Sequence, residues 1–167
     1  MKNLFTTATA ITVAIVLWGC PYQSSVPLST ASEKVNKKVL GTWLPKHETG
    51  KANPEQYVIE MRDSLHYVID HFQYNKNDSS YSVKEYLAWT TRVDNILFMN
   101  VQETGKPQHF IHRLDVMGDD LMILYQITSN IDEQFKKSDE MKKFFQKHMK
   151  LSFFYNRDEV ELVRVRK

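Results

Sequence analysis

The chain has 167 residues, of which 42% are hydrophobic and 25% are charged, and its formal net charge is only +2. This length fits one domain, and the balance of 22 basic against 20 acidic residues excludes the concentrated basic excess of a dedicated nucleic-acid binder. The many apolar residues exclude an acidic disordered chain, and the single cysteine excludes an intrachain disulfide, a CxxC redox pair and a cysteine-based zinc site.

Residues 1–19 have the pattern of an export signal. Lys2 gives a short positive start, and the stretch from Leu4 to Trp18 carries no charge. A stretch this short is typical of a signal peptide, because a spanning helix needs about 20 apolar residues. The next residues, Leu17-Trp18-Gly19-Cys20, resemble a bacterial lipobox, although Trp18 stands where small residues are usual.

The resemblance to bacterial lipoproteins implies cleavage after Gly19 and acylation of Cys20. Several acyl chains on one residue would hold the protein firmly at a membrane. Residues 21–25 lack the acidic cluster of surface-export signals, so we expect a lipid-anchored protein of the bacterial cell envelope on the periplasmic side of a membrane. The alternatives are an uncleaved N-terminal anchor and an ordinary signal peptide with a chance cysteine.

Residues 20–38 are predicted to be the lipidated cysteine and a flexible tether. Residues 21–36 contain two prolines, several Ser and Thr, and few large apolar side chains. Residues 39–167 are then predicted to form the single folded domain.

Within this domain, runs rich in Val, Ile, Tyr, Phe and Trp alternate with turn-forming clusters of Gly, Asp, Asn and Pro. This spacing indicates antiparallel meander strands of a barrel or sandwich. The predicted strands cover residues 39–46, 57–62, 65–74, 81–93, 96–103, 109–116, 121–128 and 160–166, with a further short piece at 152–155.

One segment, 131–149, has helical periodicity instead. It contains no Gly or Pro, and Ser129-Asn130 offers an N-terminal cap. Its apolar residues recur near helical spacing: Ile131, Phe135, Met141, Phe145 and Met149. The predicted fold is therefore all-β, an antiparallel meander barrel of about eight strands with one amphipathic α-helix before the last strand.

The run Gly41-Thr42-Trp43 in the first predicted strand resembles the Gly-x-Trp motif of lipocalin-like domains, and the meander after it fits the same group. The resemblance implies that a basic residue of the last strand packs over Trp43, and the matching candidates are Arg164 and Arg166. The chain departs from lipocalins in having seven predicted strands before its helix. The closest resemblance is to small bacterial lipoproteins with lipocalin-like barrels.

Three polar residues fall on strand faces that are otherwise apolar. Glu85 shares a face with Leu87 and Trp89, His112 lies on an apolar face of 109–116, and His71 lies on one of 65–74. In 121–128 the predicted inward face is Leu121, Ile123, Tyr125 and Ile127. We therefore predict that Glu85, His112 and His71 orient a ligand inside the barrel. The alternatives are that a bulge turns each outward or that each is a satisfied buried polar group.

The sequence offers no handle for catalysis or for a cofactor. It contains no G-x-S-x-G, P-loop or H-E-x-x-H motif, so we expect no enzyme. The spacing of the histidines puts His109 and His112 on opposite strand faces, so no metal site is expected. The lysines of 131–149 interleave with acidic residues, which favours a solvated face over a membrane-binding one.

The expected function is that of a non-catalytic binding module for a small apolar or amphipathic ligand, joined to the membrane by its acyl chains. The alternative is a protein-interaction or structural envelope lipoprotein whose barrel is packed solid by Trp43, Tyr125, Trp89 and their neighbours. Interior volume distinguishes the two. The aromatic residues at 144–145 and 153–155 are expected to pack over the barrel end or to form an exposed partner patch.

Overall fold

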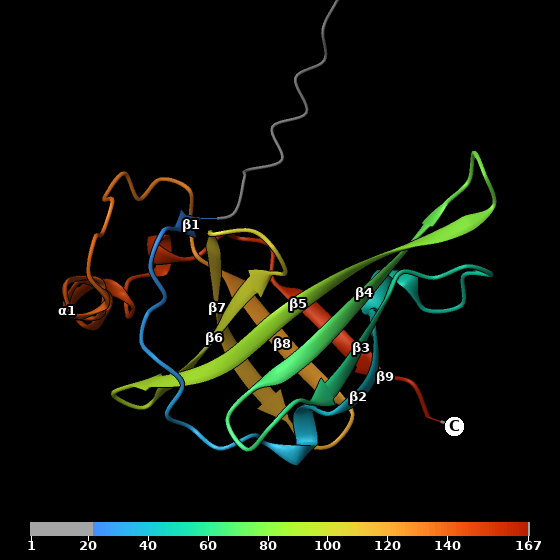
Figure 1. The fold of residues 1–167 in the computed structure, drawn as a ribbon, viewed down its shortest axis with the longest axis horizontal. Helices are drawn as coiled ribbons and strands as arrows, with labels where there is room; N and C mark the ends of the chain where they lie inside the picture. The colour runs from blue at the N-terminus through green and yellow to red at the C-terminus, as the bar shows by residue number, and fades with distance from the viewer. Residues whose placement is uncertain (1–21, 167) are drawn as a thin grey trace, which may run out of the picture.

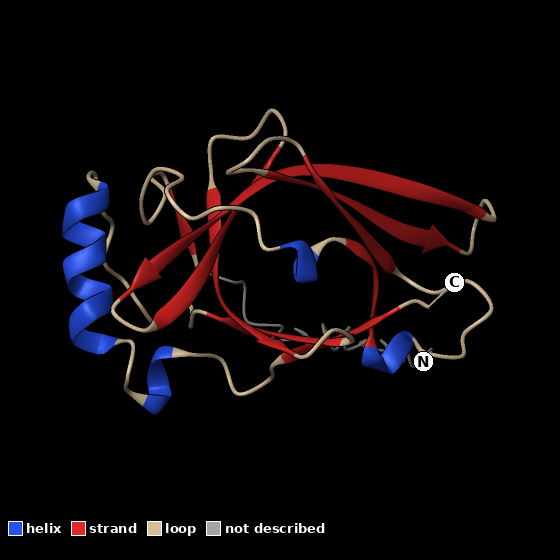
Figure 2. Ribbon diagram, turned by 90° about the horizontal axis from the view of Figure 1, so that it is seen from below, coloured by secondary structure: helices blue, strands red, loops and turns tan. Residues whose placement is uncertain are grey.

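Eight strands form a closed antiparallel barrel in the computed structural model, which describes residues 22–166 (Figures 1 and 2). Each barrel strand pairs with the next one along the chain, and the last strand closes the ring against the first. The strands are β2 (Gly41–Pro45), β3 (Gln56–Met61), β4 (Tyr67–Asn75), β5 (Ser80–Val93), β6 (Ile96–Glu103), β7 (His109–Met117), β8 (Leu121–Gln126) and β9 (Val160–Arg164). The predicted fold class is confirmed.

The strand boundaries follow the turn signals of the sequence. The two-residue turn between β5 and β6 places Asp94 at φ 50°, a left-handed conformation that Asp and Asn tolerate better than most residues. The three-residue turn between β7 and β8, residues 118–120, uses Gly118 at φ 72°. The predicted strand piece at 152–155 is instead a 3₁₀ turn, Ser152–Phe154.

The helix α1 (Ser138–His148) is shorter than the predicted 131–149. In the preceding segment, the carbonyl oxygens of Glu133 and Phe135 accept hydrogen bonds from the hydroxyls of Tyr22 and Ser25, both at 3.3 Å. These contacts with the N-terminal segment hold 131–137 outside the helix, although Ile131 and Phe135 still pack against the same apolar cluster as α1. No helix within residues 22–166 combines the length and apolar character that crossing a membrane requires.

The N-terminal segment is bound to the barrel and is not the flexible tether that its composition predicts. Strand β1 (Gln23–Ser24) pairs with the start of β7, and Leu28 is fully buried. We call residues 22–31 the strap, because they run over the outer face of the barrel (Figure 1).

Buried side chains of the barrel wall pin the strap. The Oδ1 atom of Asn100 accepts a hydrogen bond from the Leu28 amide at 2.8 Å, and Asn100 in turn donates to Thr91 Oγ1 at 3.0 Å. The indole of Trp89 donates to the Ser29 carbonyl at 2.8 Å. Asn100 is completely buried, so these bonds form in a medium where an unpaired amide would be costly.

The strap and α1 cover an apolar patch on the outer wall and so create a second core outside the barrel. The buried members of this outer core are Tyr22, Leu28, Val93, Phe98, Ile111, Ile127, Met141, Phe145, Met149 and Phe154. Phe145 packs edge-to-face on Phe98 and on Phe154, with ring centroids 5.3 and 5.0 Å apart. Such aromatic pairs add to the free energy gained from area burial alone.

One end of the barrel is closed around Trp43. The indole is fully buried and donates to the Val39 carbonyl at 2.8 Å. The Arg164 guanidinium lies over its ring, 4.2 Å from the centroid, and donates to the carbonyls of Lys38, Leu40 and Asp119. Arg164 is thus the basic residue that covers the tryptophan.

Two other members of the predicted signature have different roles. Gly41 has φ +126° and lies against the Arg164 guanidinium, so a side chain at this position would clash with the arginine. Arg166 does not reach Trp43 and pairs with Asp120.

Candidate ligand-binding cavity

A cavity of about 360 Å³ occupies one half of the barrel interior. Its volume falls within the range of small-molecule sites, roughly 300–1,000 Å³. It is lined by Tyr57, Ile59, Ile69, His71, Tyr86, Met99, Val101, Phe110, His112, Leu114, Met122, Leu124, Gln126, Val160 and Leu162. The wall is therefore mostly aliphatic and aromatic, with a few polar groups.

The strand register puts the cavity at the end opposite Trp43. On β7 the lining residues are Phe110, His112 and Leu114, from the first part of the strand. On the antiparallel neighbour β6 they are Met99 and Val101, which pair with His112 and Phe110. The other half is filled by fully buried Val39, Trp43, Tyr67 and Ala88.

The interior is thus not packed solid by the three aromatic residues expected to fill it. Trp43 fills the closed end only. Trp89 lies on the outer wall beneath the strap, where its indole bonds to Ser29, and Tyr125 lies outside beside Arg113 and Tyr155.

His112 is the most unusual polar group of the cavity wall. Among residues 22–166 its Nδ1 atom is enclosed by protein and finds no hydrogen-bond partner. Burial lowers the pKa of this imidazole to about 4, because the charged form would lose its hydration. His112 therefore stands in the cavity as a neutral ring, next to Gln126 on the paired strand.

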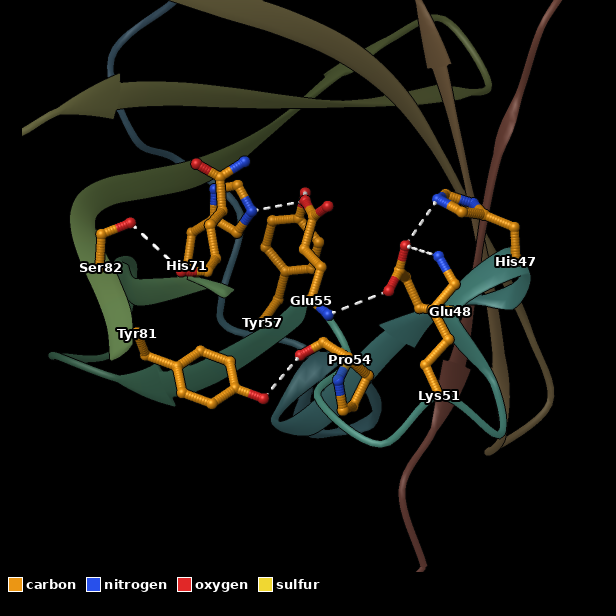
Figure 3. A network of polar contacts seen from close by, with 10 residues as sticks. His47, Glu48, Lys51, Pro54, Glu55, Tyr57, His71, Tyr81 and Ser82 are labelled. Carbon is orange, nitrogen blue, oxygen red and sulfur yellow. Dashed lines mark hydrogen bonds and ion pairs between the residues drawn. The ribbon is translucent and has the colours of Figure 1, made fainter. Parts of the chain in front are cut away.

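At the rim, Glu55 binds both Tyr57 and His71 (Figure 3). Its Oε1 atom accepts from His71 Nε2 at 2.6 Å and from the Tyr57 hydroxyl at 2.9 Å. The Tyr57 and His71 rings are stacked, with centroids 4.3 Å apart and an angle of 12° between planes. Tyr57 and His71 are direct cross-strand neighbours, and their stacked rings line the cavity side by side. We call these two rings, together with Glu55, the rim plate.

The electrostatics of this plate follow from the carboxylate. The hydrogen bond from His71 holds the pKa of Glu55 below its ordinary value. Burial, with the adjacent Glu55 charge, raises the pKa of Tyr57 far above its ordinary value, so the phenol stays protonated and remains a donor. A second anchor, Glu48, accepts from the Glu55 amide and pairs with Lys51 and His47, which fixes the loop carrying Glu55 (Figure 3).

The structure brings together two of the three predicted ligand-orienting residues. His71 and His112 both line the cavity, whereas Glu85 is exposed on the outer face of β5 and accepts from the Thr104 hydroxyl at 2.9 Å. The predicted inward face of β5 is therefore wrong. Tyr86 points into the cavity, so the face that carries Glu85 and Trp89 points outward.

The face assignment of β8 is also wrong. Met122, Leu124 and Gln126 line the cavity, while Ile127 belongs to the outer core. Strand β5 carries apolar side chains on both faces, because the strap and α1 cover Trp89 and Val93 from outside, and Ile127, directly after β8, is buried in the same outer core. Alternation of polar and apolar residues cannot tell inside from outside in such strands.

Sequence reasoning missed Glu55, Tyr57, Tyr86 and Gln126. Glu55 lies in the loop before β3, where no strand pattern marks it. Tyr86 and Gln126 lie one residue from the positions assigned inward, so the correct strand faces would have found both.

No group of three or more His, Cys, Asp or Glu within residues 22–166 is arranged to hold a metal ion. Cys20 and the predicted signal peptide lie outside the described residues. Comparison of the chain with family models, with curated proteins and with solved structures gives no match.

Proposed function

We propose that the chain is a non-catalytic binding protein of the bacterial cell envelope that carries a small, largely apolar molecule in its barrel. The observation that supports this proposal is the cavity of about 360 Å³ with its mainly apolar wall. An interior this empty would leave favourable dispersion contacts unmade in a purely structural domain. The cavity therefore favours ligand binding over the alternative of an interaction protein with a solid barrel.

The polar groups indicate what the ligand carries besides its apolar body. The neutral His112 and the amide of Gln126 can each exchange a hydrogen bond with an uncharged polar group. The rim carboxylate Glu55 is already bonded to Tyr57 and His71. We therefore propose a mostly apolar ligand with one uncharged hydrogen-bonding head group, such as an alcohol or an amide.

The proposed role is binding without catalysis. None of the described residues that line the cavity is a Ser, Thr, Cys or Lys, the side chains that most often serve as nucleophiles. His71, the histidine with a carboxylate partner, faces Glu55 and the Tyr57 ring, an arrangement that orients a side chain without activating a nucleophile.

Native mass spectrometry of the full chain, extracted mildly from a bacterial host, tests the binding proposal. A bound molecule should appear as a mass adduct. The Val101→Trp variant, which fills the cavity, should lose the adduct, and the Val83→Trp variant should keep it, because Val83 is exposed on the wall outside the cavity. Equal adducts in both variants would refute a ligand in the barrel.

Attachment to the membrane is proposed from the lipobox resemblance of Leu17-Trp18-Gly19-Cys20. The full chain should partition with the membrane fraction and carry an acyl adduct on its first peptide, and Cys20→Ser should release it into the soluble fraction. A chain that keeps residues 1–19, or that lacks the adduct, would refute this part of the proposal.

A further inference from the structure

The strap fixes the place where the proposed anchor meets the barrel. Tyr22 is only 5% exposed, and its amide donates to the Ile127 carbonyl at 3.4 Å. The next residue, Gln23, pairs with Phe110 on β7. The first described residues are therefore part of the folded domain.

Two exposed apolar side chains lie beside this point. The 3₁₀ turn 152–154 is held next to Tyr22, because Ile127 also bridges to Tyr155 and the Thr128 amide donates to the Phe154 carbonyl at 3.0 Å. Phe154 is buried in the outer core, but its neighbour Phe153 is 69% exposed and Leu151 is 39% exposed. Packing of the domain leaves both without a partner.

The charge around these two side chains is mixed, with a small basic excess. The span 147–159 contains Lys147, Lys150 and Arg157 against Asp158 and Glu159, which directly follow Arg157. The neighbouring span 131–137 contains two acidic residues, Asp132 and Glu133, against two lysines, so it does not offset this excess. Exposed apolar side chains set among basic ones are the combination that binds an anionic bilayer surface.

We infer that this face, defined by Leu151, Phe153, Lys150 and Arg157, rests on the lipid bilayer and sets the orientation of the barrel at the membrane. The inference rests on the proposed acylation of Cys20. Two residues of chain span at most about 7 Å, so acyl chains on Cys20 would begin that close to the fixed Tyr22. A domain attached so closely has one end at the membrane, whereas a tether of 18 residues would let it turn freely.

The cavity lies at the same end of the barrel. Phe110 pairs with Gln23 of the strap and also lines the cavity, while the end closed by Trp43 and Arg164 lies at the far ends of the strands. The orientation therefore turns the cavity half toward the lipid and the closed half away from it.

Quenching of tryptophan fluorescence by brominated phospholipid tests the orientation. The full chain, acylated in a bacterial host, is reconstituted into phosphatidylethanolamine–phosphatidylglycerol vesicles that contain brominated phosphatidylcholine. A Phe153→Trp variant adds an indole on the proposed face. The matched control is Met117→Trp, since Met117 is 55% exposed and lies seven residues beyond Phe110 on β7, about 23 Å away at 3.3 Å per residue.

The parent chain supplies the background from Trp43 and Trp89. After this is subtracted, the indole of Phe153→Trp should lose most of its emission in brominated vesicles, and that of Met117→Trp should lose almost none. Equal quenching of the two variants in vesicles that still carry the protein on flotation would overturn the orientation and leave the anchor standing. Failure to float, with no acyl adduct by mass, would overturn the anchor and the orientation together.

Discussion

The protonation of His112 should make the barrel unstable in mild acid. An enclosed, neutral imidazole with a pKa of about 4 takes up a proton far less readily than a histidine in the unfolded chain, whose ordinary pKa is 6.5. Because the folded-state pKa is the lower one, the unfolded state binds more protons as the pH falls, and stability falls with it. The contribution is fully present above pH 6.5 and declines between there and about pH 4.

The magnitude follows from the two pKa values. At about pH 5, protonation stabilises the unfolded chain by about 2 kcal/mol, while the folded chain gains almost nothing. Urea unfolding should therefore give a lower free energy of unfolding at about pH 5 than at about pH 7.5, and about 2 kcal/mol of this drop should come from His112. In His112→Leu the drop should be smaller by that amount, whatever the variant does to stability at neutral pH.

Other acid-sensitive groups do not confuse this measurement. The lowered pKa of His109, and those of Glu55, Asp63 and Asp120, are common to both proteins and cancel in the comparison. A Met61→Leu variant serves as the control, because this side chain is 56% exposed and carries no titratable group, and it should keep the full drop. The reasoning would be refuted if His112→Leu kept the parent's full drop.

Three further predictions concern the elements that position the cavity. Arg164→Met should lower the free energy of unfolding by about 2–3 kcal/mol, because three carbonyls and the Trp43 ring lose their cationic partner, and urea unfolding measures this loss. Asn100→Ala should destabilise the protein by about 2 kcal/mol and speed hydrogen exchange at the Leu28 amide, whose acceptor it removes; unchanged exchange there would show that the strap does not depend on Asn100. Glu55→Gln should cost about 1 kcal/mol at neutral pH, and less as the pH falls through the carboxyl range, because the stabilisation that goes with its lowered pKa is present above that range and lost below it. Unfolding of parent and variant measured at about pH 7 and about pH 3 would contradict this if the difference did not shrink in acid.

Local patterns predict the elements of this fold well. The strand β6 begins and ends where its turn signals place it, at Ile96 and Glu103, because a two-residue turn at Asp94-Asn95 and the Thr104-Gly105 pair bracket it. The resemblance carried by Gly41-Thr42-Trp43 likewise named Arg164 as one of two candidates to cover Trp43, and Arg164 lies over that ring. The ends of β6 depend on residues next to them in the sequence, and the cover of Trp43 depends on a single contact with Arg164.

The faces of β5 and β8 depend instead on what covers them, and this is why they were misassigned. Trp89 and Ile127 are apolar because the strap and the 3₁₀ turn bury them from outside. The strap itself reads as a tether, since its Pro, Ser and Thr residues suit a solvated chain. Its order comes from distant partners, Asn100 and Thr91, whose contacts with residues 28 and 29 no local pattern reveals.

The closed end and the strap together limit the routes by which the proposed ligand could reach the barrel. Arg164, with bonds to three carbonyls, seals the Trp43 end so that the empty volume lies at the other end. The strap enters at that same end through Tyr22 and Gln23, and its covering of the outer wall explains why strands there can carry apolar side chains on both faces. If the face around Phe153 rests on lipid, the rim plate of Glu55, Tyr57 and His71 lies with the cavity at the end of the barrel nearer the bilayer.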